Sequence, residues 1–199
     1  MFDIYNLKIW GVLPISFSLA AGECMAIEGP SGSGKTLLLR ALADLDPIEG
    51  DKRLNGHSYL SMTGPQWRQK VCYNAAEPGW WSDTPADSFK NRDKILTQLY
   101  DVGLDAQCLD RPISQLSTGE RQRLSLLRLL EGDPEVLLLD EPTGALDPEA
   151  TMRVENLLNA VRRTGTSILI VTHDKAQAKR LANRKLLFDQ GRVEIIQNP

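Results

Sequence analysis

The sequence is poor in the features that mark secreted, disulfide-bonded or metal-binding proteins. It has three cysteines, Cys24, Cys72 and Cys108, and no two of them form a CxxC pair. An odd number of isolated thiols argues against a disulfide framework and against a zinc site. A signal peptide is not expected, because Asp3 and Asn6 interrupt the only early apolar stretch. These absences predict a protein of the reducing cytosol.

Long apolar runs and a strong excess of one charge are missing as well. The runs Val136–Leu139 and Ile168–Val171 are far shorter than the roughly 20 residues that cross a bilayer. The net charge of −3 gives no general attraction to nucleic acid or acidic lipid. The length of 199 residues and the apolar content of 42% fit one globular domain. Any role at a membrane would therefore need a partner that spans it.

The sequence instead alternates short strand-like runs with segments of helical periodicity. The strand-like runs are Cys24–Glu28, Val136–Leu139, Ser167–Val171 and Arg192–Ile196. Continuous apolar runs of this length suit strands buried on both faces of a parallel sheet. Helices are predicted at Lys35–Leu45, before Pro47, and at Asp147–Arg163, before Thr164-Gly165. The order strand, helix, strand implies right-handed crossovers and an α/β fold.

The middle of the chain has a different character. It shows little strand character, whereas Ser88–Val102 and Thr118–Leu130 have helical periods. We therefore expect a single domain, residues 1–199, in which a small helical sub-domain is inserted into an α/β core. The expected core comprises residues 1–76 and 129–199, and the expected sub-domain comprises residues 77–128.

A phosphate-binding pattern follows the first predicted parallel strand. The pattern GxxxxGK[ST] is matched by Gly29, Pro30, Ser31, Gly32, Ser33, Gly34, Lys35 and Thr36, and Leu37 comes next in the predicted helix. Glycines let backbone N–H groups curl around phosphates, and the start of the helix adds positive potential. Lys35 is expected to reach the β- and γ-phosphates, and the Thr36 hydroxyl to ligate Mg²⁺. The alternative is a glycine-rich turn that matches by chance, and the pattern alone leaves kinases, GTPases and many ATPases open.

Two acidic residues, Asp140 and Glu141, end the apolar run that begins at Val136. Ligand sites of α/β proteins form at the carboxyl ends of the strands, so Asp140 is expected to hold Mg²⁺ through water. Glu141 is expected to polarise the attacking water. The alternative is a buried strand followed by a solvated acidic turn, which the phosphate-binding pattern upstream disfavours.

A third motif carries a family resemblance. Leu116-Ser117-Thr118-Gly119-Glu120 resembles the LSGGQ signature of the ATP-binding cassette (ABC) family, with Thr for the first Gly of the pair and Glu for the final Gln. Arg121-Gln122-Arg123 and Arg128 resemble the helix that follows this signature. Taken alone, the motif would rather be an ordinary helix start, with Ser117 as the cap and Glu120 completing a capping box. Its position ahead of the acidic strand favours the signature.

Further stretches match the family in the same order along the chain. Pro142-Thr143-Gly144-Ala145-Leu146-Asp147 resembles the DEPTSALD segment, with Asp147 as the D-loop carboxylate. Val171-Thr172-His173-Asp174 resembles the switch motif, whose histidine contacts the γ-phosphate. Without these neighbours, His173 would be taken for a structural residue. Gly22-Glu23 resembles the family's turn before the first parallel strand.

The resemblance implies a P-loop NTPase (RecA-like) core that binds ATP and Mg²⁺ and hydrolyses ATP, with Lys35, Glu141 and His173 as catalytic residues. It implies an ATP-sandwich dimer with a second copy, in which the partner's nucleotide is contacted by Ser117, Thr118, Gly119, Glu120 and Asp147. It also implies an integral-membrane permease as partner, a place on the cytoplasmic face of the cell membrane, and no nucleic acid. Two stretches, Arg123–Arg128 and Val171–Lys175, are similar to small bacterial ATPases associated with iron export.

Two other functions are alternatives to that of a transporter subunit. A soluble cassette that acts on DNA or ribosomes needs a long coiled-coil insertion or a second cassette, and the sequence has neither. A nucleotide-dependent regulator with weak hydrolysis stays open. Trp80-Trp81 fall near the family's groove for a permease helix, and packing within the sub-domain is the alternative for them.

The sequence departs from the family pattern at two places. Ala76 stands where the family has the Q-loop glutamine, and an alanine has no side chain that can form a hydrogen bond. Glu77, one position along, is the candidate replacement. The aromatic residue that stacks on adenine is Trp10 or, as the second choice, Tyr5, and edge packing is the alternative for Trp10.

Overall fold

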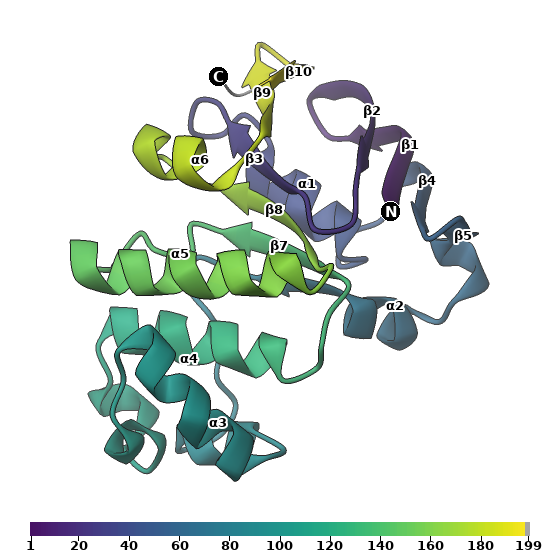
Figure 1. Ribbon diagram of the computed structural model, residues 1–199. Coiled ribbons are helices and arrows are strands. Elements are labelled where there is room, and N and C mark those ends of the chain that lie inside the picture. The colour runs from purple at the N-terminus through teal and green to yellow at the C-terminus, as the bar shows by residue number, and fades with distance from the viewer. Residues whose placement is uncertain (198–199) are drawn as a thin grey trace.

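A six-stranded sheet runs through the structure, a computed structural model that describes residues 1–197 (Figure 1). The strand order is β10-β9-β3-β8-β7-β6. The strands are β3 (Cys24–Glu28), β6 (Val71–Asn74), β7 (Val136–Asp140), β8 (Ser167–Val171), β9 (Arg184–Asp189) and β10 (Arg192–Gln197). All the pairings are parallel except that of β10 with β9. The predicted α/β fold is confirmed, and the four predicted strands are present, two of them one residue longer than predicted.

A second, antiparallel sheet was not predicted from the sequence. Its order is β2-β1-β4-β5, and its strands are β1 (Phe2–Ile9), β2 (Val12–Leu19), β4 (Glu49–Leu54) and β5 (His57–Ser58). These strands mix buried and exposed residues, as expected of a sheet with one face toward the core. In Figure 1 this sheet lies on the far side of α1 from the six-stranded sheet.

Four helices accompany the two sheets: α1 (Lys35–Leu42), α2 (Gly64–Lys70), α5 (Pro148–Arg163) and α6 (Lys175–Leu181). The prediction of a helix as far as Leu45 is wrong by three residues, because Asp44 adopts a left-handed backbone with φ of 61° that ends the helix. The second predicted helix begins one residue later than expected because Asp147 is its N-cap, and it ends at Arg163 as predicted.

The middle of the chain folds as helices and turns. Its two α-helices are α3 (Arg92–Leu99) and α4 (Thr118–Leu130). Short 3-10 helices are found at Tyr59–Ser61, Pro85–Ser88, Tyr100–Val102, Ala106–Leu109 and Ile113–Gln115. The prediction of α4 is confirmed, whereas the helix predicted from Ser88 begins only at Arg92, because Asn91 caps it. In Figure 1, α3 and α4 lie at the bottom, with α5 between them and the sheet.

The six-stranded sheet separates two buried clusters of apolar side chains. In β7, Val136 and Leu138 belong to the cluster that includes α1 and the antiparallel sheet. Leu137 and Leu139 belong to the cluster that includes α4, α5 and α6. Successive side chains of a strand point to opposite faces, so every residue of such a strand is buried. This double burial explains why the strands are uniformly apolar.

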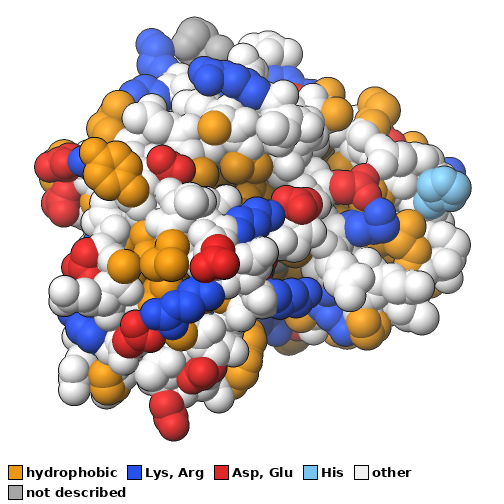
Figure 2. Space-filling view, turned by 60° about the horizontal axis from the view of Figure 1, so that its bottom comes forward, with side chains coloured by type: hydrophobic (Ala, Val, Ile, Leu, Met, Phe, Trp, Pro, Cys, Tyr) orange, Lys and Arg blue, Asp and Glu red, His pale blue; other side chains and the backbone are white. Residues whose placement is uncertain are grey.

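The thiols Cys24, Cys72 and Cys108 are buried and free, and burial raises the pKa of the Cys24 thiol to about 12. Within residues 1–197, no helix is both long enough and apolar enough to cross a membrane. Figure 2 shows acidic and basic side chains interspersed over the face that carries α3 and α4.

Trp67 in α2 joins the antiparallel sheet to α1 and offers a test of this core. Its side chain is fully buried, its indole N–H donates to the Leu42 carbonyl over 2.9 Å, and the Phe2 ring lies 6.0 Å away. We predict that Trp67→Ala lowers the free energy of unfolding by about 3–5 kcal/mol, measured by urea denaturation. Leu60→Ala, at a side chain that is 76% exposed, is the control and should change it by less than about 0.5 kcal/mol. Equal losses in the two variants would contradict this role for Trp67.

Candidate functional site

The phosphate-binding pattern forms a loop between the carboxyl end of β3 and the start of α1. Gly29 is the residue of this loop that no other residue type can replace without strain. It has φ of 149°, and a Cβ at this position would lie 2.7 Å from both the Cβ and the carbonyl oxygen of Phe188 in β9. The loop therefore packs directly on the backbone of the neighbouring strand, and only glycine permits that approach.

Lys35 is held inside this loop. Its side chain is buried, and Nζ donates to the carbonyl oxygens of Gly29 over 2.8 Å and Pro30 over 2.7 Å. An ammonium group has three N–H donors, so these two bonds leave one donor for another acceptor. The loop thus fixes the position of a positive charge.

Asp140, at the carboxyl end of β7, is nearly fully buried and accepts two hydrogen bonds on Oδ2. The donors are the Thr36 hydroxyl over 2.8 Å and the Tyr73 hydroxyl over 3.2 Å. Tyr73, in β6, was missed by the sequence analysis, because nothing in the motifs marks a phenol as a partner of the acidic strand. Burial raises the pKa of the Tyr73 phenol, and the neighbouring Asp140 carboxylate raises it further, so the phenol stays a donor.

The Thr36–Asp140 pair fits Mg²⁺ by the chemistry of its donors. Mg²⁺ takes oxygen ligands and usually binds through one or two carboxylates, waters and substrate phosphates. In residues 1–197, no cluster of three or more His, Cys, Asp or Glu side chains could hold a metal. A hydroxyl and a carboxylate 2.8 Å apart therefore suit a magnesium ion that is completed by phosphate oxygens and water.

Glu141 and His173 face each other across the carboxyl ends of β7 and β8. His173 Nε2 lies 3.1 Å from Glu141 Oε1. The Glu141 backbone is left-handed, with φ of 47°, and its N–H donates to the Val171 carbonyl over 3.0 Å. This unusual conformation for a non-glycine residue turns the chain out of the sheet directly after the buried strand.

These side chains line one cavity of about 260 Å³. Its lining consists of Ser31, Gly32, Gly34, Lys35, Thr36, Leu37, Asp140, Glu141, Val171 and His173. A second hollow of about 590 Å³ shares Glu141 and His173 with it and extends to Gly144, Leu146 and Met152. The structure thus brings Lys35, Thr36, Asp140, Glu141 and His173 together at the carboxyl ends of the strands. Three residues of the predicted phosphate loop, Gly29, Pro30 and Ser33, do not line this cavity.

The predicted signature residues lie elsewhere: none of Ser117, Thr118, Gly119 and Glu120 lines the cavity. Ser117 caps α4, with Oγ accepting from the Glu120 N–H over 3.2 Å, and Glu120 Oε2 accepts from the Ser117 N–H over 2.8 Å. This is the capping box that was the alternative to a nucleotide contact. Gly119 packs so closely on the D-loop segment that a Cβ there would lie 2.9 Å from Leu146.

Asp147 and the two aromatic candidates also lie outside this cavity. Asp147 caps α5 by accepting from the Ala150 N–H over 2.9 Å, and that bond lowers the pKa of its carboxyl group. Trp10 is 89% exposed in the turn between β1 and β2. A Cβ at Gly34 of the phosphate loop would lie 3.1 Å from Val12, two residues further along. Tyr5 packs on Arg53, whose guanidinium carbon lies 5.1 Å from the ring centroid, so Trp10 is the better placed of the two.

The Q-loop position is held by an unexpected contact. Neither Ala76 nor Glu77 lines the cavity, and the Glu77 side chain is exposed. The Ala76 carbonyl accepts from Nε2 of Gln122, a buried residue of α4, over 3.0 Å. Gln122 belongs to the stretch that resembles the family, and the sequence alone predicts no role for it.

The adjacent tryptophans contribute to both packing and surface. The Arg128 guanidinium carbon lies 4.3 Å from the centroid of the Trp80 ring and 4.4 Å from that of Trp81. Trp81 is nevertheless 77% exposed. Burial lowers the pKa of Arg128. Trp80 thus packs within the fold, whereas Trp81 presents an exposed aromatic ring in contact with the Arg128 guanidinium.

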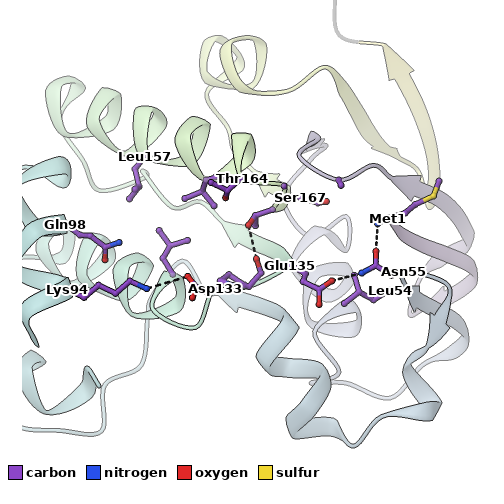
Figure 3. Close-up of a pocket in the computed structure, with 16 residues that line it drawn as sticks. Met1, Leu54, Asn55, Lys94, Gln98, Asp133, Glu135, Leu157, Thr164 and Ser167 are labelled. Atoms are coloured by element: carbon purple, nitrogen blue, oxygen red, sulfur yellow. Dashed lines mark hydrogen bonds and ion pairs between the residues drawn. The ribbon is translucent and has the colours of Figure 1, made fainter. Parts of the chain in front are cut away.

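Another cavity of about 590 Å³ lies at the opposite edge of the sheet, by the amino ends of β7 and β8 (Figure 3). On one side Asn55 donates to Glu135 over 2.7 Å, and on the other Lys94 pairs with Asp133 at 3.5 Å. No predicted site residue lines it. Ligand sites of α/β folds form at carboxyl ends, so the loop cavity remains the candidate site.

Comparison with known proteins decides the family. The profile of the family described as "ABC transporter" matches residues 12–144, which include the phosphate loop, the signature segment and the acidic strand. The chain belongs to the ABC transporter family. The cassette also resembles the probable iron export ATP-binding protein FetA of Escherichia coli, with 39% identity over 81% of this chain and 77% of FetA.

Other relatives of the cassette are longer proteins. Protein STAR1 of Oryza sativa is 36% identical over 90% of this chain, and the sulfate/thiosulfate import ATP-binding protein CysA of Bradyrhizobium diazoefficiens is 34% identical over 93% of it. The matched segments make up only 55% of STAR1 and 58% of CysA. The cassette therefore spans little more than half the length of these two relatives.

Solved structures confirm the fold. A dimeric cassette in a post-hydrolysis state, bound to ADP and Pi, superposes with a TM-score of 0.87 at 22% identity, covering 100% of this chain and 99% of that one. The ATP binding subunit of an ABC transporter superposes with a TM-score of 0.88 at 21% identity, covering 98% and 89%. The predicted P-loop NTPase cassette fold is thus confirmed.

The contact of Gly29 with β9 gives a test of the loop geometry. We predict that Gly29→Ala lowers the free energy of unfolding by about 2 kcal/mol or more, because both the backbone angle and the Phe188 contact are violated. Gly56→Ala is the matched control. Gly56 also has a positive φ, of 81°, but nothing lies within 4 Å of its Cβ position, so its cost should stay near 1 kcal/mol. Urea unfolding of both variants measures the difference, and equal costs would refute the steric argument.

Proposed function

We propose that this cassette binds Mg-ATP in the loop cavity, hydrolyses it, and thereby drives a membrane transporter. The observation that carries the proposal is the convergence of Lys35, Thr36, Asp140, Glu141 and His173 on one cavity at the carboxyl ends of the strands. A cation for the phosphates, oxygen ligands for Mg²⁺ and a residue that positions the attacking water are the parts that recur in sites of phosphoryl transfer to water.

Each side chain has a defined task in this proposal. The N–H groups of the loop and the Lys35 ammonium bind the β- and γ-phosphates and neutralise charge. Thr36 and Asp140 hold Mg²⁺, which supplies charge compensation on the phosphate oxygens. Glu141 orients and polarises the attacking water. His173, whose Nε2 lies 3.1 Å from Glu141 Oε1, fixes the direction of that carboxylate and contacts the γ-phosphate.

We propose further that the active form is a head-to-tail dimer of two cassettes. The segment from Ser117 to Glu120 and the D-loop residue Asp147 stay away from the cavity of their own chain. The hollow beside Glu141 and His173, lined by Gly144, Leu146 and Met152, has a volume of about 590 Å³ and could receive side chains of a second copy. In this arrangement Ser117, Thr118, Gly119, Glu120 and Asp147 contact the partner's nucleotide, and Trp10 stacks on the adenine.

The membrane part of the proposal rests on the named relatives. FetA is named as a probable iron export protein and CysA as an import protein, so the proposal concerns the motor and not the cargo. We place the dimer on the cytoplasmic face of a membrane, bound to a permease. Residues 77–128 serve as the helical sub-domain that meets the permease, and residues 1–76 and 129–199 as the catalytic core. Trp81, exposed beside Arg128, suits a surface that binds a permease helix.

A regulator with weak hydrolysis is a second candidate, and Ala76 is the observation that favours it. The Q-loop position offers no side chain to the magnesium or to the attacking water, and Glu77 is exposed. One preorganised polar contact fewer would slow hydrolysis without weakening nucleotide binding. The mutations below separate the two candidates.

The first test concerns the carboxylate. Glu141→Gln is expected to lower the rate of ATP hydrolysis by at least ~10², because the group that polarises water is lost, while ATP binding is retained. Lys35→Ala is the contrasting variant and should weaken ATP binding itself. Phosphate release and nucleotide titration provide the two measurements. Hydrolysis by Glu141→Gln at the parent rate would refute the proposed function.

The second test concerns the dimer. Glu141→Gln with Mg-ATP is expected to dimerise at micromolar protein, as measured by light scattering, because bound ATP is not consumed. Adding Ser117→Arg should block the dimer and spare ATP binding. Ser117→Ala removes the same helix cap without adding bulk, so in that background a dimer should still form at higher ATP. Monomers at saturating ATP in Glu141→Gln would contradict the head-to-tail arrangement.

The third test concerns the Q-loop. If Ala76 limits hydrolysis, Ala76→Gln should raise kcat several-fold at unchanged ATP affinity, since the contact is made in the transition state. Glu77→Ala is the companion variant in steady-state kinetics. Loss of activity in Glu77→Ala, without a gain in Ala76→Gln, would assign the role to Glu77 instead.

A further inference from the structure

One buried amide connects the two loops that frame the catalytic carboxylate. Gln122 lies in the first turns of α4 and is only 4% exposed. Its Nε2 donates to the carbonyl of Ala76 over 3.0 Å and to the carbonyl of Glu141 over 3.4 Å. Ala76 follows β6 and Glu141 follows β7, two adjacent parallel strands. The amide group of Gln122 therefore bridges the carboxyl ends of both strands.

The orientation of this amide is determined by its neighbours. Both partners are carbonyl oxygens, so only the NH₂ group can face them, because a flipped amide would set three oxygens against one another. Within residues 1–197, Gln122 Oε1 is buried and has no hydrogen-bond partner. A buried acceptor without a donor is unfavourable, so packing alone does not explain a glutamine here. A methionine of similar size would fill the same space without that loss.

The bond to Glu141 acts on the residue whose geometry matters most. Glu141 has a left-handed backbone with φ of 47°. Its carbonyl accepts from the Gly144 N–H over 3.1 Å as well as from Gln122. With its N–H bonded to Val171, the peptide groups on both sides of Glu141 are anchored. The direction of a side chain depends on these backbone angles, and here it places the carboxylate 3.1 Å from His173.

The helix that carries Gln122 gives the bridge its significance. Gln122 follows Ser117, the cap of α4, by five residues in the printed sequence. Any displacement of α4 would therefore act on Ser117, on the Ala76 segment and on the Glu141 backbone together. The Q-loop position, which has lost its own polar side chain, stays tied to the helix through its backbone carbonyl.

We propose that Gln122 is a positioning residue that holds Glu141 in its working conformation and makes that conformation depend on the placement of α4. The inference rests on the proposed function of Glu141 and adds a residue that acts through it. Gln122 does not touch the nucleotide, because it is not part of the lining of the loop cavity.

The test is Gln122→Met, which removes the amide and keeps the volume. We expect kcat for ATP hydrolysis to fall about tenfold or more, because the carboxylate is misplaced. The KM and the binding of ATP should stay within about twofold, because the phosphate loop is not touched. In the Glu141→Gln background the same change should cause no further loss, since Gln122 acts only through that carboxylate.

Ser125→Ala is the matched control. Ser125 lies one turn further along α4, is equally buried, and donates to Asn74 Oδ1 in β6 over 2.7 Å. Ser125→Ala loses a buried hydrogen bond between α4 and β6 without contacting Glu141, so its kcat should stay near that of the parent. Should Gln122→Met fail to fold, Gln122→Asn replaces it, because its amide is one methylene too short to reach both carbonyls.

The outcomes separate the inference from the function beneath it. Inactive parent protein, or Glu141→Gln at the parent rate, overturns the proposed function. A strong loss in Glu141→Gln with near-parent kcat in the folded Gln122 variant overturns only the role of Gln122. Equal losses in Gln122→Met and Ser125→Ala, or a further loss in the double variant, would likewise reduce Gln122 to a packing residue.

Discussion

The hydrogen bond between Thr36 and Asp140 is the contact on which the rest of the site depends. It joins the start of α1 to the carboxyl end of β7, two segments 104 residues apart in sequence. This bond links the phosphate loop to the acidic strand. It therefore sets the distance between Lys35, which is proposed to bind the phosphates, and Glu141, which is proposed to polarise the attacking water. Lys35, held by the carbonyls of its own loop, precedes Thr36, and Glu141, whose N–H donates to Val171 of β8, follows Asp140. Hydrogen bonds within the protein thus hold the groups that line the cavity, and catalysis by charge stabilisation requires preorganisation of this kind.

The residues of this site can be predicted from the sequence because they belong to contiguous motifs beside strands that are apolar throughout. The phosphate loop, Asp140 and Glu141 could be placed from spacing, since parallel strands deliver their carboxyl ends to one edge. The roles of Tyr73 and Gln122 could not be predicted from spacing. Tyr73 bonds to Asp140, 67 residues away, and Gln122 bonds to the backbone carbonyl of Ala76, 46 residues away, which carries no sequence signal. The antiparallel sheet could not be predicted from the sequence for a related reason. Its strands mix buried and exposed residues without a continuous apolar run or a strict alternation, and such mixed runs are hard to distinguish from loops.

The signature segment shows that a structural and a functional role can be held by the same atoms. Ser117 and Glu120 form the capping box at which α4 begins, and this cap presents the first turn of the helix at the surface. The stability of the helix and the proposed contact with a partner's nucleotide therefore draw on one hydroxyl. Gly119 adds a constraint of its own, since its lack of a side chain lets the D-loop segment approach, so α4 and the D-loop are expected to move as one body.

The double burial of β7 has a consequence for how the sheet finds its alignment. Where one face of a strand is polar, a slip by one residue would expose apolar side chains and is penalised. In β7 both faces are apolar, so a slip would merely exchange Leu137 and Leu138 between the two clusters with little change in buried surface. The alignment must then be fixed at the strand end, where Asp140 accepts from Thr36 and the N–H of Glu141 meets Val171. The residues to which the chemistry is assigned thus also fix the register of β7 in the core.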